Sequence, residues 1–155
     1  MKEISIKKGD ILQRKGDLNS KIYNVKTGLL RSYTIDEQGK EHIYMFAPED
    51  WIMSDNTLDN EPCDLFIDAL EDSELEMRNK DFTDADVNTD KILRRMGVLQ
   101  KRVIMLMSSS AIERYDHFVE RYPQIVQRVP QKMIASYLGI TPEALSRVKK
   151  ERFRK

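Results

Sequence analysis

The chain has 155 residues, of which 40% are hydrophobic and 34% are charged, and its formal net charge is +0. No segment approaches the roughly 18 or more consecutive apolar residues of a membrane span, and the first residues contain no apolar signal core. The single cysteine, Cys63, excludes an internal disulfide and a metal site built from four thiolates. These features predict a cytoplasmic protein with no membrane partner.

Charge is distributed very unevenly along the chain. Residues 49–90 contain fifteen Asp and Glu against two Lys and Arg, whereas residues 128–155 contain eight Lys and Arg against two Glu. A basic end on a neutral chain indicates an anionic partner for that end, and a solvated tail is the alternative.

The first half of the sequence has the pattern of a β protein. Short runs rich in Ile, Tyr, Val, Leu and Phe predict strands, and glycine-containing breaks between them mark hairpins. The runs lie at residues 7–12, 21–25, 28–35, 40–46, 65–70 and 73–78. Strands this short and closely spaced predict an antiparallel β roll, similar to a jelly roll or double-stranded β-helix. With the helical second half, the predicted fold class is α+β.

The second half changes to a helical period. Apolar residues recur at spacings of four and three along one long helix: Ile92, Met96, Leu99, Val103 and Leu106. This heptad seam can pack against the β roll of its own chain or against the same helix of a second copy. Because neighbouring residues such as Leu93 and Ile104 make the helix apolar on more than one side, the pattern favours a homodimer.

Two shorter helices are predicted next. Ser110 or a neighbouring serine can cap the first of them, which ends at Pro123. Pro130 stands at the opening of the second, where its missing N–H does no harm. Gly139 falls where this helix should end, and it can take the left-handed conformation that turns the chain.

The last helix is predicted to begin with Thr141 as its cap and Pro142 in its first position. Two helices joined by a glycine turn form a helix-turn-helix, whose second helix enters the DNA major groove. The residues expected where the two helices approach, turn and pack are Ala135, Gly139 and Leu145. An ordinary helical hairpin with a solvated basic face is the alternative.

At 100° per residue, the last helix turns a polar set away from its packing side. Ala144, Leu145, Val148 and the stem of Arg152 fall on the packing side. The predicted base-reading residues are Glu143, Ser146 and Arg147, since arginine bonds bidentate to guanine and glutamate accepts from cytosine N4. The predicted phosphate contacts are Thr141, Lys149, Lys150 and Arg154.

These residues resemble the Crp/Fnr family of bacterial transcription regulators. The stretch TPEALSRVKK is similar to that family's recognition helix, its Glu-x-x-Ser-Arg set is similar to the Fnr branch, and TGLLRSYTIDEQGKEHIYMF is similar to strands of the family's β roll. The resemblance covers nearly the whole chain. It implies a cyclic-nucleotide-binding-like sensor domain over residues 1–86, a dimerisation helix over 87–108 and a helix-turn-helix domain over 109–155.

The resemblance also implies partners. The protein is expected to act as a homodimer that binds a two-fold site on double-stranded DNA and controls transcription, with RNA polymerase as a further candidate partner. Compared with the family, the chain looks like a short form: the roll starts almost at Met1 without the usual helical segment, and the chain ends at Lys155 without the usual wing.

The ligand site of the family is altered. Residues 49–66 match the region where cyclic-nucleotide-binding members hold the phosphate with a Gly-Glu turn and an Arg-Ser/Thr pair, but they contain no glycine and no arginine and are acidic. Because a phosphate would be repelled there, cyclic AMP binding by the usual route is not expected. One cysteine is too few for an Fnr-type iron–sulfur cluster. No cofactor is predicted, and the effector stays open.

Two other classes of protein fit parts of the sequence. A metal-dependent cupin enzyme needs clustered histidines, whereas His42 and His117 lie in separate predicted elements and no catalytic set stands out, so no enzymatic activity is predicted. A ligand-sensing or protein-interaction β-roll module without sequence-specific DNA binding is the alternative function.

Overall fold

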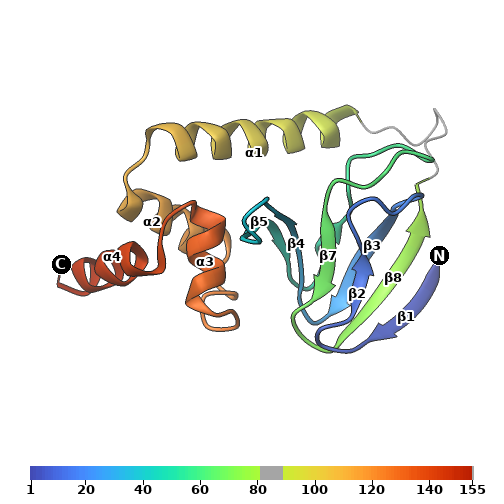
Figure 1. Ribbon diagram of the computed structural model, residues 1–155, viewed down its shortest axis with the longest axis horizontal. Helices are drawn as coiled ribbons and strands as arrows, with labels where there is room; N and C mark the ends of the chain where they lie inside the picture. The colour runs from blue at the N-terminus through green and yellow to red at the C-terminus, as the bar shows by residue number, and fades with distance from the viewer. Residues whose placement is uncertain (81–88, 155) are drawn as a thin grey trace. The chain divides into compact units, whose positions relative to one another are not determined.

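The computed structural model describes residues 1–80 and 89–154 of the chain. The chain divides into two compact units, Met1–Asp81 and Phe82–Lys155. Within the described residues, the first unit contains eight strands and the second contains four helices (Figure 1). The predicted α+β fold class is therefore confirmed. The boundary expected between residues 86 and 87 lies outside the described residues.

The first unit is built from two antiparallel sheets. One has the strand order β1-β8-β3-β6 and the other the order β2-β7-β4-β5. The strands are β1 (Lys2–Ile6), β2 (Ile11–Gln13), β3 (Lys21–Thr27), β4 (Leu30–Ile35), β5 (Glu41–Ala47), β6 (Ile52–Met53), β7 (Phe66–Ala69) and β8 (Ser73–Asn79). Each neighbouring pair in both sheets is antiparallel, which confirms the predicted roll.

Both sheets contribute to the core of the roll. Tyr23, Val25 and Leu75 come from one sheet, and Leu30 and Ile67 come from the other; all five are buried in one cluster. Successive side chains of a strand point to opposite faces, so alternate residues of each strand reach this core. The alternation of apolar residues in the sequence has this physical cause.

Sequence patterns missed two strands and misplaced one. β1 escaped notice because it is an edge strand with exposed polar residues, and β6 because it has only two residues. The run at residues 7–12, predicted as one strand, instead contains a turn at Lys8 and Gly9 that precedes β2. This turn is closed by Asp10, whose carboxylate accepts a hydrogen bond from the Lys7 N–H at 2.8 Å.

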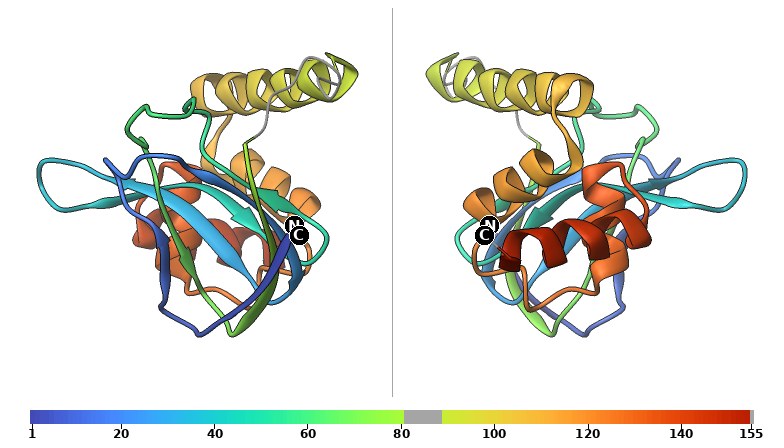
Figure 2. Two further views of the ribbon diagram at one scale, coloured as in Figure 1. Left: turned by 90° about the vertical axis from the view of Figure 1, so that its right-hand side faces the viewer. Right: turned by 90° about the vertical axis from the view of Figure 1, so that its left-hand side faces the viewer.

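The second unit contains α1 (Thr89–Ser108), α2 (Ala111–Arg121), α3 (Gln131–Leu138) and α4 (Pro142–Arg154). The predicted cap is present at the start of α2, where the Ser110 hydroxyl accepts from the Glu113 N–H and the Glu113 carboxylate accepts from the Ser110 N–H at 2.7 Å. The rings of Phe118, Tyr122 and Tyr137 pack together with centroids 5.3 to 5.5 Å apart. Figure 2 shows α4 lying across α3.

Candidate functional site

A tight turn centred on Gly139 joins α3 to α4. Gly139 has φ 64° and ψ 32°, the left-handed conformation predicted for it from the sequence. Its N–H donates to the Ser136 carbonyl at 3.2 Å, and the Ile140 N–H donates to the Ala135 carbonyl at 3.0 Å. The turn therefore satisfies two of the carbonyl groups that the end of a helix leaves without an intrahelical partner.

The cap and the packing side of α4 hold it in place. Its first residue is Pro142, and the Ala144 N–H donates to the Thr141 hydroxyl at 3.1 Å, as expected for an N-terminal cap. Leu145 and Val148 are buried, and α4 packs against both α2 and α3. One side of the helix is thus fixed within the unit.

Arg152 belongs to the packing side with its charge as well as its stem. Its Nε atom lies 3.0 Å from a carboxylate oxygen of Asp116 in α2, and its guanidinium lies 5.6 Å from the centroid of the Tyr115 ring. Sequence reasoning had assigned only the stem of Arg152 to this side. The guanidinium is engaged by α2, which separates Arg152 from the basic residues on the outward side.

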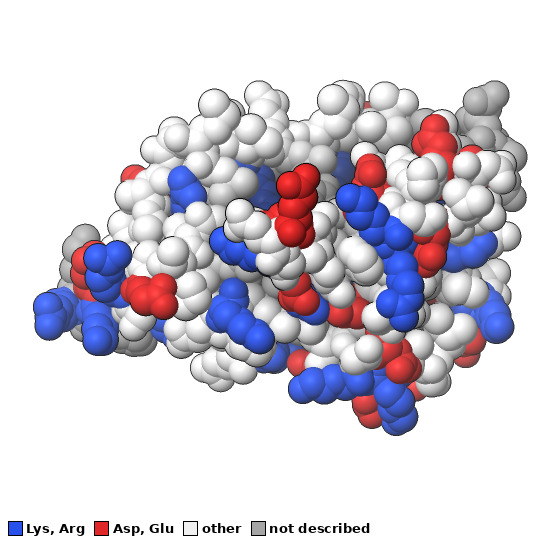
Figure 3. All heavy atoms as spheres, in the orientation of Figure 1, with Lys and Arg blue, Asp and Glu red and all other residues white. Residues whose placement is uncertain are grey.

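The opposite side of α4 is open to solvent. The exposed residues of this side, with the capping residue that precedes them, are Thr141, Glu143, Ser146, Arg147, Lys150 and Arg154. Lys149 is half-buried at the margin. In Figure 3, Lys and Arg side chains gather over α4 at the left edge, with acidic side chains beside them. The structure therefore brings the predicted base-reading and phosphate-contacting residues together on one helix and its cap.

α1 exposes an apolar strip along its length. Of the predicted seam, Ile92, Met96 and Val103 are 49%, 59% and 54% exposed, while Leu99 and Leu106 are half-buried. The atoms of α1 that face the viewer in Figure 3 are mostly neither acidic nor basic. Among the described residues, no helix is long and apolar enough to cross a membrane. An apolar surface of this kind is available for packing against another apolar surface.

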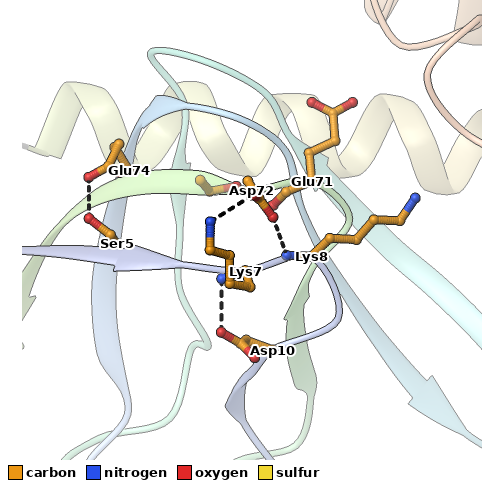
Figure 4. Close-up of polar contacts among 8 residues, drawn as sticks. Ser5, Lys7, Lys8, Asp10, Glu71, Asp72 and Glu74 are labelled. Carbon is orange, nitrogen blue, oxygen red and sulfur yellow. Dashed lines mark hydrogen bonds and ion pairs between the residues drawn. The ribbon is translucent and has the colours of Figure 1, made fainter.

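A polar cluster at one end of the roll has a structural role. Asp72, in the turn between β7 and β8, accepts hydrogen bonds from the Lys7 ammonium and the Lys8 N–H, both at 2.9 Å (Figure 4). These two donors hold the pKa of Asp72 below its usual value. Next to it, a Cβ on Gly28 would collide with the Ser73 side chain, so the turn between β3 and β4 requires glycine. The hydrogen bonds of Asp72 thus join the turn at Lys8 to the turn between β7 and β8.

The acidic segment of the roll is closed around a buried carboxylate. Asp55 is 4% exposed. Its carboxylate accepts hydrogen bonds from the Gln13 amide at 3.1 Å, the Asp64 N–H at 3.0 Å and the Leu65 N–H at 2.9 Å. Amide groups of this kind could hold an anion from solution, but here they bind an anion that the chain itself supplies.

A buried cation, the ammonium of Lys80, binds the same segment of the roll. The Lys80 ammonium donates to the backbone carbonyls of Asp55 and Thr57, the latter at 2.7 Å. Burial lowers the pKa of Lys80 and raises the pKa of the nearby Cys63 thiol, so the thiol form is favoured. Among the described residues, no group of His, Cys, Asp and Glu is arranged to hold a metal ion.

The first unit is thus a β roll, and the second is a long helix followed by three shorter helices. The profile of the cyclic nucleotide-binding domain matches residues 3–85. The chain belongs to the cyclic nucleotide-binding domain family. No curated protein matches it by sequence.

Solved structures share the fold over nearly the whole chain. FixK2 from Bradyrhizobium japonicum has a TM-score of 0.76 and 20% identity, over 97% of this chain and 83% of that one. A transcriptional regulator of the CRP/FNR family from Thermus thermophilus has a TM-score of 0.78 and 18% identity, over 99% and 86%. A mutant of CooA from Carboxydothermus hydrogenoformans has a TM-score of 0.74 and 19% identity, over 99% and 76%.

These similarities confirm the resemblance to the Crp/Fnr family that the sequence predicted. The chain shares its fold with a solved transcriptional regulator of the CRP/FNR family. Sequence reasoning missed the buried pair of Asp55 and Lys80 and the contacts of Arg152 with α2. Neither has a local signal, because each joins residues more than twenty positions apart.

Proposed function

We propose that the protein is a DNA-binding transcription regulator of the Crp/Fnr type. The observation that carries this proposal is the outward side of α4, which presents Glu143, Ser146 and Arg147 to solvent while its other side is packed on α2 and α3. A guanidinium in this position can bond bidentate to the O6 and N7 atoms of guanine. A carboxylate one helical turn away can accept from the amino group of cytosine.

The surrounding basic residues supply contacts to the DNA backbone. We assign this role to Thr141, Lys149, Lys150 and Arg154. Lysine and arginine near a phosphate release counterions from the duplex, which gives affinity without sequence preference. Arg152 is left out of this set because its guanidinium is engaged by Asp116. Ala135, Gly139 and Leu145 act as the residues at which α3 and α4 approach, turn and pack.

The active form is a homodimer that pairs two copies of α1. The seam consists of Ile92, Met96, Leu99, Val103 and Leu106. Three of these side chains are about half exposed in the single chain, and pairing would remove them from water. Two copies of α4 related by a two-fold axis would enter successive major grooves, with half-site centres about one helical turn apart. RNA polymerase is a further candidate partner of this cytoplasmic dimer.

Residues 1–86 act as the sensor domain, 87–108 as the dimerisation helix and 109–155 as the DNA-binding domain. In the sensor domain, Asp55 already occupies the amide groups of the acidic segment. This observation supports the proposal that the roll does not bind cyclic AMP in the manner of the family. The roll is then either vestigial or responds to a different effector.

Selection of binding sites from random duplex DNA tests the proposal, followed by two alanine variants on the selected site. Arg147→Ala should cost about 1–3 kcal/mol of binding free energy and relax the preference at one guanine of each half-site. Lys150→Ala should weaken binding to every sequence, because a phosphate contact carries no base information. It should also reduce the slope of log K against log salt concentration by about one per monomer.

The contrast between the two variants is decisive. Equal losses on selected and random DNA for both variants would make Arg147 a phosphate contact only. If no sequence is enriched from the random pool, the β-roll module without sequence-specific DNA binding becomes the better description.

A further inference from the structure

The C-terminal end of α3 is held by arginines from two other helices. The last four carbonyls of a helix lack intrahelical partners. In α3, the first two of these accept from the N–H groups of the turn, as described above. The Tyr137 carbonyl accepts from Arg102 Nη2 in α1 at 3.3 Å, and the Leu138 carbonyl accepts from Arg114 Nη1 in α2 at 3.1 Å. All four carbonyls are thereby accounted for.

Arg114 joins three pieces of backbone with one guanidinium. Besides Leu138, its Nε atom donates to the Ser109 carbonyl at 3.0 Å, and its Nη2 atom donates to the Leu106 carbonyl at 2.7 Å. Leu106 lies in the last two turns of α1, and Ser109 lies in the link to α2. Because the guanidinium is planar and rigid, its three bonds fix the end of α3 against the end of α1.

Arg102 holds the same helix end by a second route. Its guanidinium lies 4.0 Å from the centroid of the Tyr137 ring, so it contacts both the ring and the backbone carbonyl of that residue. Tyr137 in turn packs against Phe118 and Tyr122 in the core of the unit. Two positive charges at the C-terminus of a helix are also favourable to its dipole.

We propose that Arg102 and Arg114 are positioning residues that fix the α3–α4 pair relative to α1 and thereby set the separation of the two DNA half-sites. This inference rests on the proposed function. In a dimer paired through α1, that helix is the frame shared by both subunits. The place of each α4 relative to its own α1 then determines how far apart the two copies of α4 lie. Both arginines act through α3 and need not touch DNA.

Variants of the full chain can separate positioning from simple stabilisation. Arg102→Met and Arg114→Met remove the donors but keep a long side chain, and Arg114→Lys keeps the charge without the planar fork should the methionine variant fail to fold. Arg94→Met is the matched control, because Arg94 is an exposed arginine of α1. Each protein is titrated with the selected duplex and with duplexes whose half-sites are one base pair closer or farther apart.

We expect the unaltered protein and Arg94→Met to bind the selected spacing best. For Arg102→Met and Arg114→Met, affinity at that spacing should fall by about tenfold or more, since hydrogen bonds from a charged donor are lost. The penalty for a changed spacing should shrink at the same time, because the two copies of α4 are no longer held at one separation. If affinity falls but the spacing penalty stays that of the unaltered protein, the arginines only stabilise the fold and the inference is wrong.

A measurement without DNA keeps this inference distinct from the proposed function. Hydrogen exchange of the Gly139 and Ile140 amides should be faster in Arg114→Met than in Arg94→Met, while sedimentation gives both the same dimer affinity. Unchanged exchange would show that Arg114 does not restrain the turn, and the inference would fail even for a protein that binds DNA. Faster exchange in a protein that binds no DNA would overturn the proposed function and retain the link between α1 and the turn.

Discussion

The two units of the chain use their charged and apolar residues in opposite ways. In the roll, the buried charges of Asp55 and Lys80 bind backbone groups of the same unit, and the apolar residues of both sheets form one core. In the helical unit, the seam of α1 and the polar side of α4 are exposed. The acidic segment buries Asp55, whereas Asp59, Glu61 and Asp64 of the same segment are exposed. Charge density in the sequence alone therefore does not distinguish a charge used inside the fold from one open to solvent.

The largest expected effect is on the exposed seam of α1. Replacing Leu99 and Val103 together with glutamate would place unpaired carboxylates of like charge between the two copies of the helix. Because each carboxylate buried without a partner costs several kcal/mol, the dimer dissociation constant should rise about a hundredfold or more. Sedimentation velocity at micromolar concentration measures this.

A matched double variant tests whether the position of the charges matters. Arg94→Glu with Lys101→Glu adds two glutamates to exposed positions of α1 away from the seam and should leave the dimer intact. An unaltered protein that sediments as a monomer would contradict the homodimer.

The next effect concerns the buried carboxylate of Asp55 in the roll. Asp55→Ala would leave the backbone N–H groups of Thr57, Asp64 and Leu65 without their acceptor, so the free energy of unfolding should fall by about 3 kcal/mol. Urea unfolding followed by the fluorescence of Trp51, the only tryptophan, reports on this unit. Glu143→Ala removes an exposed carboxylate from α4 and should change nothing in the same experiment. If the two variants were equally stable, the buried carboxylate of Asp55 would contribute no more to stability than the exposed carboxylate of Glu143, and the contrast between the units would be wrong.

Alkaline pH should weaken the roll, and the hydroxyl of Tyr23 should account for part of this loss of stability. Burial, with nearby negative groups, raises the pKa of Tyr23 to about 12. In the unfolded chain a tyrosine loses its proton near pH 10, so the contribution of Tyr23 to stability is complete below about pH 10 and is lost as the pH rises toward 12. Urea unfolding of the roll at a series of alkaline pH values should show this decline, and Tyr23→Phe should make it smaller. A decline that Tyr23→Phe leaves unchanged would assign it to other groups.

The smallest expected effect is no effect at all. Cyclic AMP titrated into the protein in a calorimeter should give no binding heat at micromolar concentrations, because the amide groups of the acidic segment are occupied by Asp55. Micromolar binding, or a nucleotide retained by the purified protein, would contradict this prediction and would show that the acidic segment can rearrange to admit a ligand.

Features decided within a few residues were predictable from the sequence. The cap at Ser110, the left-handed Gly139 and the cap at Thr141 each depend on a side chain or backbone conformation and its near neighbours. Contacts decided by the tertiary fold were not predictable. Asp55 meets Lys80 across 25 positions and Arg114 meets Leu138 across 24, and neither pair leaves a periodic pattern. β1 and β6 were missed because one is a polar edge strand and the other is too short to alternate.

The link between α1 and α2 is short, and hydrogen bonds fix its backbone. The Ser109 N–H donates to the Met105 carbonyl at 3.0 Å, and Ser110 is held in the capping box of α2. A rotation of α1 about its own axis is thus passed on to α2 instead of being absorbed by a loop. A chimera with a foreign sensor fused ahead of α1 would therefore depend on helical phase. Seven added residues shift that phase by only about 20°, whereas two added residues would shift it by about 200° and turn the sensor to the other side of α1.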